Sequence, residues 1–182
     1  PMGVTAIITF TYFKMDTILL SVLQSNAHVG IYNVAYKIME NLIFFPAMLA
    51  GLILPLLSRY IFTDRDRFEE IANKTFKVFV IAIVPIVIGT WFLAPNIIAI
   101  VSGQGFEESA TVLRILIFAL VFIFFGSYFN MLLIVGNAQK KLMQTLIFAA
   151  IFNIALNLFL IPRYSYIGSA STALATEALV VF

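Results

Sequence analysis

The sequence predicts an all-α fold, a polytopic membrane bundle of about six helices that forms a single lobe over residues 1–182. Hydrophobic residues make up 62% of the chain and charged residues only 11%, whereas soluble domains are about half apolar and a quarter charged. Apolar stretches long enough to cross a bilayer, which takes about 20 residues, recur along the chain. The breaks between them are short, so consecutive helices must run antiparallel.

The expected helices are the six apolar stretches at residues 4–23, 30–57, 76–101, 110–136, 142–161 and 167–182. They do not alternate apolar and polar residues as the strands of an outer-membrane barrel do. A soluble all-α core is disfavoured, because helices that are apolar on every face leave no polar surface for water. Since the chain begins with Pro1 and ends inside an apolar run, we expect it to be a piece of a longer polypeptide.

Positive charges in the loops predict the orientation of the lobe. The breaks at 59–77 and 137–141 carry seven basic residues: Arg59, Arg65, Arg67, Lys74, Lys77, Lys140 and Lys141. The opposite side holds Arg163, with Arg114 just inside a helix. Cytoplasmic loops carry the excess of Lys and Arg, so both breaks are expected on the cytoplasmic side of the cell membrane. The mixed-charge segment 64–77, "DRDRFEEIANKTFK", is either a short interfacial helix or a solvated connector.

Prolines interrupt two of the expected helices. Pro46 and Pro55 lie in the second stretch, and Pro85 and Pro95 lie in the third. A proline inside a helix removes a hydrogen bond and kinks the helix. The kinks either adjust the shape of the helices or act as hinges of a transporter.

Two charges, Lys14 and Asp16, lie inside the first apolar stretch. Inserting each charge at the centre of a bilayer costs about 2.5–3.5 kcal/mol. The two residues are two positions apart, which places their side chains about 200° apart around a helix, so they do not pair with each other. In an antiparallel hairpin with the second stretch, Asp16 is level with Lys37 and Lys14 with Glu40. The sequence therefore predicts one or two cross-helix ion pairs, which either hold the bundle together or line a hydrophilic substrate cavity.

Two further charges lie in later stretches. Glu177 is near the middle of the last one, where a carboxylate is protonated, paired from another helix or used in proton or cation coupling. Arg114 is nearer the outer surface and either snorkels to head groups or binds an anionic substrate.

The remaining polar residues of the apolar stretches are amides. Asn153 and Asn157 are one turn apart on the fifth stretch, and Asn130 lies on the fourth. Such amides join membrane helices by hydrogen bonds or contact a substrate. With no Cys and a single histidine, His28, that has no ligand set around it, the sequence predicts no metal site, no cofactor and no enzyme. Nothing resembles a nucleic-acid-binding stripe.

The order of these segments resembles a known family. Residues 13–60, "FKMDTILLSVLQSNAHVGIYNVAYKIMENLIFFPAMLAGLILPLLSRY", resemble the start of the second half of the O-antigen and exopolysaccharide flippases of the multidrug/oligosaccharidyl-lipid/polysaccharide exporter superfamily. The positions that carry the match are Asp16, Val29, Gly30, Tyr32, Ala35, Lys37, Ile38, Glu40, Pro46, Pro55, Leu57 and Ser58.

Two later segments continue the resemblance. "SGQGFEESATVLRIL" is similar to the glycine and phenylalanine loop of the family. "NIALNLFLIPRYSYIGSASTALATE" is similar to its Asn-containing helix, proline turn and small-residue helix, through Asn153, Asn157, Pro162, Gly168, Ala170, Ala173, Thr176 and Glu177. Ser165 stands where many members have glycine, so a less sharp or differently wound turn is expected there.

The resemblance implies a transporter of about twelve or more helices in two MATE-like lobes, of which this chain is the second and the N-terminal lobe is missing. Such proteins move a lipid-linked oligosaccharide to the outer leaflet by alternating access. Lys14, Lys37 and Arg114 are then candidates for phosphate or sugar contacts. Asp16, Glu40 and Glu177 are candidates for coupling to H⁺ or Na⁺ or for holding the cations in place.

Two other functions stay open. A drug/cation antiporter of the same superfamily favours an acidic cavity, whereas this lobe has charges of both signs. The other is a non-transporting membrane scaffold for glycosyltransferases, which is favoured if structural ion pairs satisfy all the charges in the membrane.

Overall fold

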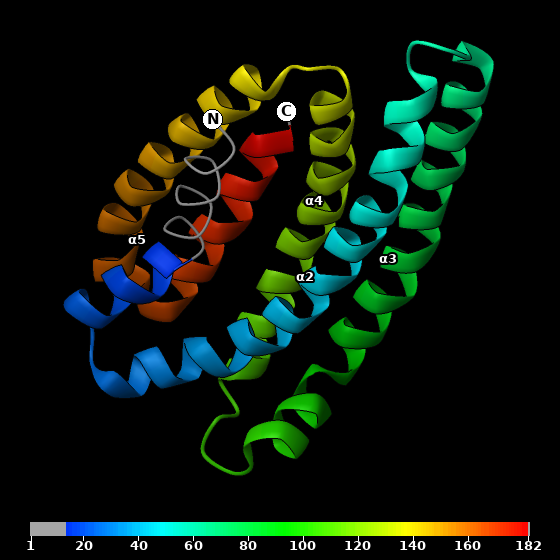
Figure 1. The fold of residues 1–182 in the computed structure, drawn as a ribbon. Helices are drawn as coiled ribbons and strands as arrows, with labels where there is room; N and C mark the ends of the chain where they lie inside the picture. Colours follow the sequence, from blue (N-terminus) through cyan, green and yellow to red (C-terminus); the bar gives the residue numbers. More distant parts are fainter. Residues whose placement is uncertain (1–13, 182) are drawn as a thin grey trace.

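The computed structural model describes residues 14–181, which form helices joined by short connections (Figure 1). A helical segment at residues 14–23 is followed by α2 (Asn26–Tyr60), α3 (Arg65–Ser102), α4 (Ser109–Val135) and α5 (Gln139–Val181). The described residues contain no strand. The predicted all-α membrane bundle is therefore confirmed.

The number of continuous helices differs from the number of predicted stretches. Within the described residues, four helices are long and apolar enough to cross a membrane, α2 to α5. The fifth and sixth expected stretches are the two arms of α5, which folds back on itself at Ser165, where φ is 51° and ψ is −133° (Figure 1). Residues 4–13 of the first expected stretch lie outside the described part of the chain.

The turn at Ser165 has a non-helical backbone inside α5. Ser165 adopts a positive φ that glycine would adopt more easily, and its Oγ lies 2.9 Å from Nδ1 of His28. Gln24 donates to the carbonyl of Ile161 across the same turn at 3.1 Å. The two arms pass so closely that a Cβ on Gly168 would lie 2.6 Å from the carbonyl oxygen of Leu160.

The mixed-charge segment is neither a separate interfacial helix nor a connector, because α3 runs unbroken from Arg65 through to Ser102. Asp64 caps its N-terminus by accepting a hydrogen bond from the backbone N–H of Arg67. Pairs one turn apart, Arg65 with Glu69 and Glu70 with Lys74, support the first turns. At 1.5 Å per residue, this helix is about 57 Å long. It exceeds the hydrocarbon core of about 30 Å, so the charged end projects beyond it.

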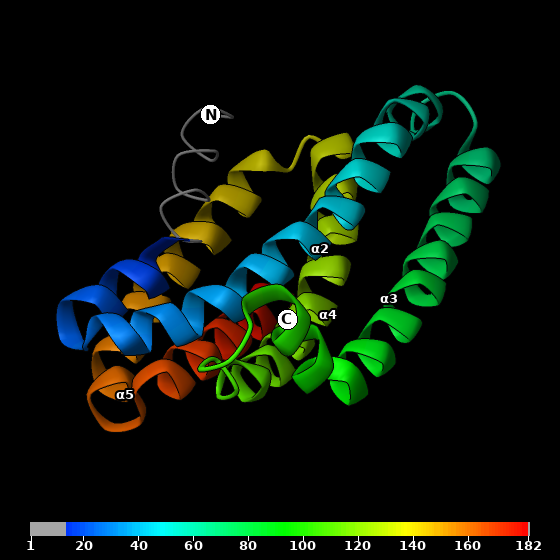
Figure 2. The same cartoon turned by 90° about the horizontal axis from the view of Figure 1, so that it is seen from below.

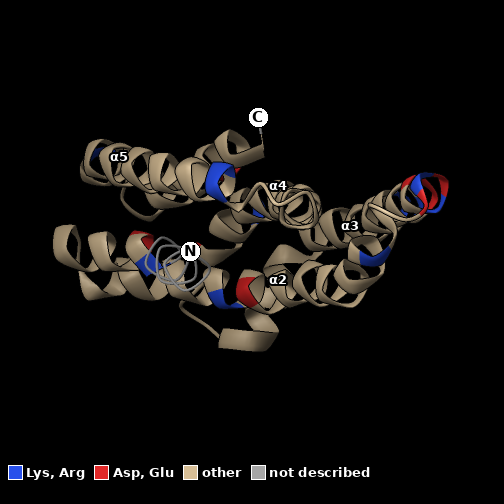
Figure 3. Cartoon of the chain, turned by 45° about the horizontal axis from the view of Figure 1, so that its top comes forward, with Lys and Arg blue, Asp and Glu red and all other residues tan. Residues whose placement is uncertain are grey.

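Charged side chains are unevenly distributed over the described residues. Figure 3 shows both signs gathered where α2 and α3 meet, whereas most of the length of the helices carries few charges. Pro46 and Pro55 lie within α2, and Pro85 and Pro95 lie within α3. Both helices therefore continue through their prolines.

Helix α4 is the central element, and it packs against α2, α3 and α5 (Figure 2). In the apolar part of α4, 56% of the residues are buried, compared with 11–22% in the apolar parts of the other three spans. Phe124 and Tyr128 of α4 meet Phe79 of α3 in edge-to-face contacts. Outward-facing side chains such as Phe92 of α3 are 73% exposed, which suits a surface solvated by lipid.

Candidate functional site

A groove of about 410 Å³ opens between the helical segment 14–23, α2 and the loop that follows α3. Its lining consists of Lys14, Gly30, Asn33, Val34, Tyr36, Lys37, Glu40 and Phe106. The α2 residues recur every three or four positions, which places them on one face of that helix. Three of the predicted site residues, Lys14, Lys37 and Glu40, thus come together here.

The groove contains one of the two ion pairs that the hairpin geometry allowed. Nζ of Lys14 lies 2.9 Å from Oε1 of Glu40, and the same ammonium lies 5.3 Å from the centroid of the Tyr36 ring. Lys37 is exposed, and no ion pair joins it to a carboxylate within residues 14–181. The described groove therefore holds two cations and one anion.

Asp16 does not pair with Lys37, because it faces away from the groove. Its side chain is buried, and Oδ1 accepts hydrogen bonds from Nδ2 of Asn157 at 2.6 Å and from Nδ2 of Asn153 at 3.0 Å. The hydroxyl of Tyr32 lies 3.3 Å from Oδ2. The separation of about 200° between positions 14 and 16 thus sends one charge to the groove and the other towards α5.

The groups around this carboxylate form one buried network, called here the Asp16 cluster. Asn157 donates to Oδ1 of Asn153 at 3.0 Å, and Asn153 also lies 3.4 Å from the hydroxyl of Thr176. The members of the cluster are Asp16, Tyr32, Asn153, Asn157, Ser169 and Thr176. Asn153 and Asn157 therefore join the arms of α5 to the segment 14–23, and neither lines the groove. No buried side-chain nitrogen or oxygen of the described residues lacks a hydrogen-bond partner.

The other predicted site residues lie elsewhere. Glu177 is buried in the second arm of α5, next to Thr176 of the Asp16 cluster. Asn130 is half-buried in α4 and is not among the residues that line the groove. Within residues 14–181, no group of His, Cys, Asp and Glu is arranged to hold a metal ion.

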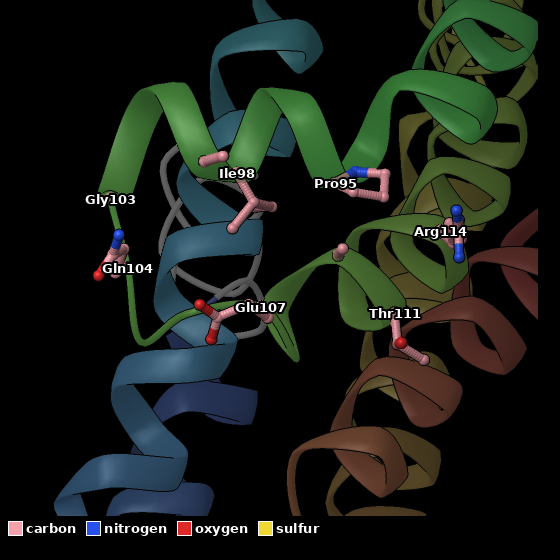
Figure 4. Close-up of a pocket in the computed structure, with 9 residues that line it drawn as sticks. Pro95, Ile98, Gly103, Gln104, Glu107, Thr111 and Arg114 are labelled. Carbon is pink, nitrogen blue, oxygen red and sulfur yellow. The ribbon is translucent and has the colours of Figure 1, made fainter.

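Arg114 belongs to a second cavity, which has a volume of about 480 Å³ and lies between the end of α3 and the start of α4 (Figure 4). The loop between these helices separates the two sites. Phe106 lines the groove, whereas Gln104 and Glu107 line the second cavity. The structure therefore places Arg114 apart from Lys14 and Lys37.

Sequence reasoning missed Asn33 and Tyr36 as groove residues and Tyr32 as a partner of Asp16. Asn33 lies four residues before Lys37, and Tyr36 lies four before Glu40. This helical spacing was the available signal for the two groove residues. Asn33 also meets the segment 14–23, since its Oδ1 accepts a hydrogen bond from Thr17 at 3.2 Å.

Comparisons with known proteins find one family model and two relatives that are named as flippases. A family model described as "Polysaccharide biosynthesis protein" matches residues 1–111. Two proteins of Haloferax volcanii are similar along almost the whole chain. The first, described as a probable flippase, AglR, is 26% identical over 93% of this chain. The second, described as a probable low-salt glycan biosynthesis flippase, Agl15, is 24% identical over 94%.

The matched region is a fraction of each relative. The chain spans 36% of the length of the first protein and 37% of the second. No solved structure matches the chain.

Proposed function

Because this chain belongs to the polysaccharide biosynthesis protein family of membrane flippases, we propose that it is a lobe of a transporter for a lipid-linked oligosaccharide. The proposed substrate is a polyprenyl-diphosphate sugar, which is flipped across the cytoplasmic membrane by alternating access. The N-terminal lobe of the same polypeptide closes the other side of the groove.

The observation that carries this proposal is the groove with Lys14 and Lys37 in a lobe that is otherwise apolar. A diphosphate cannot enter hydrocarbon unaided, because an unpaired charge there costs many kcal/mol. Ammonium groups form strong charge-assisted hydrogen bonds with phosphate. Lys37 is the principal phosphate ligand in this proposal, while Lys14 is shared with Glu40.

The rest of the groove suits a sugar. Asn33 and Tyr36 present an amide and a phenol beside the two lysines, and both groups donate and accept hydrogen bonds. The polyprenyl tail stays in lipid, along the apolar outer faces of the helices.

The Asp16 cluster is the proposed coupling element. It holds a carboxylate beside two amides and three hydroxyls in the membrane part of the lobe, and oxygen ligands of this kind suit hard cations. Either a proton or Na⁺ neutralises Asp16 in this proposal, with Glu177 close by. Since Lys14 lies on the same helical segment, a change at Asp16 moves a wall of the groove.

The test is flipping of a lipid-linked oligosaccharide by the full-length protein in sealed vesicles, measured by protection of the sugar from an external lectin or glycosidase. Lys37→Ala and Lys37→Gln should both lose most of the activity while the protein still folds. Lys74→Ala is the matched control, because Lys74 is an exposed lysine that pairs with Glu70 at the start of α3.

If both Lys37 variants flipped the glycolipid at the wild-type rate, the groove would not be part of the substrate path. Cation-driven drug export without any flipping of the glycolipid would replace the proposal with a drug/cation antiporter. A protein that binds glycosyltransferases and moves neither substrate would be a scaffold.

A further inference from the structure

The second cavity lies between the last turns of α3 and the first turns of α4 (Figure 4). Its volume of about 480 Å³ falls within the range of about 300–1,000 Å³ that is usual for small-ligand sites. It is lined by Pro95, Ile98, Ala99, Gly103, Gln104, Glu107, Ala110, Thr111 and Arg114. It has one cationic and one anionic side chain, and the proposed flipping mechanism uses neither.

Arg114 is held by a backbone carbonyl that Pro95 leaves without its helical donor. Pro95 has no N–H, so the carbonyl of Trp91, four residues earlier, is left without its helical donor. Nε of Arg114 donates to that carbonyl at 3.1 Å, and the guanidinium lies 5.9 Å from the centroid of the Trp91 ring. This bond occupies Nε, so the two terminal nitrogens of the guanidinium remain as donors for a ligand in the cavity.

Glu107 is fixed by the loop. Its Oε1 accepts a hydrogen bond from the backbone N–H of Gly105 at 3.0 Å, which holds the pKa of this carboxyl below its usual value. In this loop Gly103 and Gly105 have positive φ angles of 73° and 95°, which residues other than glycine rarely adopt. The cavity therefore presents a carboxylate and a guanidinium, both positioned by backbone contacts.

The cavity lies at one end of the spans α3 and α4, which is where a membrane helix meets the lipid head groups. Arg114 lies five residues after the first residue of α4, about 7.5 Å along the helix axis. On α3, the large apolar side chains of Phe92 and Ile100 are largely exposed close in sequence to the lining residues Pro95 and Ala99. Tryptophan and arginine are typical residues of this interfacial zone. A fitting ligand therefore has a polar head with both charges and an apolar tail.

We propose that this cavity binds the head group of a membrane phospholipid that carries a primary amine, with the phosphodiester on Arg114 and the ammonium on Glu107. Thr111, one turn before Arg114 on α4, donates to a remaining phosphate oxygen, whereas Gln104 lies at the Glu107 end of the cavity (Figure 4). A phosphoglycerol head group has no cation for Glu107, and a quaternary ammonium has no N–H to donate. The site therefore distinguishes phosphatidylethanolamine from phosphatidylglycerol and phosphatidylcholine. This inference is independent of the proposed transport substrate.

The test uses the full-length protein, purified in detergent and stripped of lipid. Each of the three phospholipids, with identical acyl chains, is added in turn, and binding is measured by native mass spectrometry and by the rise in melting temperature. Phosphatidylethanolamine should bind most tightly to the wild type. Glu107→Gln should weaken that binding about tenfold or more, because it removes the charge that accepts from the ammonium, and should bring it level with phosphatidylcholine.

Further variants keep the result interpretable. Thr111→Val removes a hydroxyl of the cavity without touching the Arg114–Trp91 contact, and it should weaken the binding of all three lipids. Lys37→Gln, in the groove, should leave phosphatidylethanolamine binding unchanged.

Two results would overturn the proposal. One is binding of phosphatidylethanolamine to Glu107→Gln with wild-type affinity. The other is displacement of phosphatidylethanolamine by a lipid-linked oligosaccharide, which would assign the cavity to the substrate path.

Discussion

Nζ of Lys14 and Oε1 of Glu40 lie 2.9 Å apart, and this ion pair joins the helical segment 14–23 to α2 at the wall of the groove. The two side chains are 38% and 48% exposed, and ion pairs this open contribute only about 0–1 kcal/mol to stability. The contact matters chiefly because it fixes where a cation stands in the groove.

The ion pair gives the first prediction. Lys14→Glu alone should lower the melting temperature of the full-length protein, because it puts two carboxylates together, and adding Glu40→Lys should restore it. Flipping should stay impaired in the double variant, since the cation has moved to the other helix. Full recovery of flipping in the vesicle assay would mean that the position of this charge is unimportant.

Asn157 gives the second prediction. Asn157→Ala removes the shortest hydrogen bond to Asp16, 2.6 Å, and should destabilise the protein by about 1–3 kcal/mol, the usual cost of an unsatisfied buried polar group. Thermal unfolding in detergent measures the loss. Asn41→Ala is the matched control, because among the described residues the exposed Asn41 donates to the backbone of Lys37 in its own helix. Equal losses of unfolding free energy in the two variants would contradict a stabilising role for the hydrogen bonds of the Asp16 cluster.

Gly168 gives the third prediction. Gly168→Ala places a Cβ 2.6 Å from the carbonyl oxygen of Leu160, and a backbone atom cannot rotate away, so the α5 hairpin must open. We expect a large loss of melting temperature or failure to accumulate in the membrane. Gly51→Ala in α2 meets nothing within 4 Å and should be neutral or slightly stabilising, because alanine favours a helix over glycine. A wild-type melting temperature for Gly168→Ala would contradict the close passage of the two arms.

Phe79 gives the fourth prediction. Phe79 is fully buried and packs edge to face against Phe124 and Tyr128. Phe79→Ala should cost about 3–5 kcal/mol, as is usual for a buried phenylalanine. Phe92→Ala, on the lipid-facing side of the same helix, should cost much less. The unfolding of both variants in one detergent compares them directly, and a reversed order would contradict the assignment of the inner and outer faces of α3.

The sequence predicted the parts of this structure that depend on local pattern. Apolar stretches gave the helices, and equal depth in a hairpin gave the contact of Lys14 with Glu40. The donors to Asp16 were not predictable in this way, because Asn153 and Asn157 lie 137 and 141 residues further along the chain. No local spacing relates positions so far apart.

Two other features needed the three-dimensional structure. The charges of 65–77 look the same in a separate surface helix and in the projecting end of a long span, so the continuity of α3 could not be read from them. The hydrogen bond from Arg114 to Trp91 depends on how α3 and α4 pack together, which neither helix specifies alone.

The long separation within the Asp16 cluster also bears on how the protein is made. Ribosomes add about 5–20 residues per second, so the 141 residues between Asp16 and Asn157 take roughly 7–28 s to synthesise. During that interval the segment 14–23 has left the ribosome while its amide donors do not yet exist. Asp16 must then keep water or a temporary partner at its carboxylate. The α5 hairpin must therefore be synthesised before the segment 14–23 can complete its contacts.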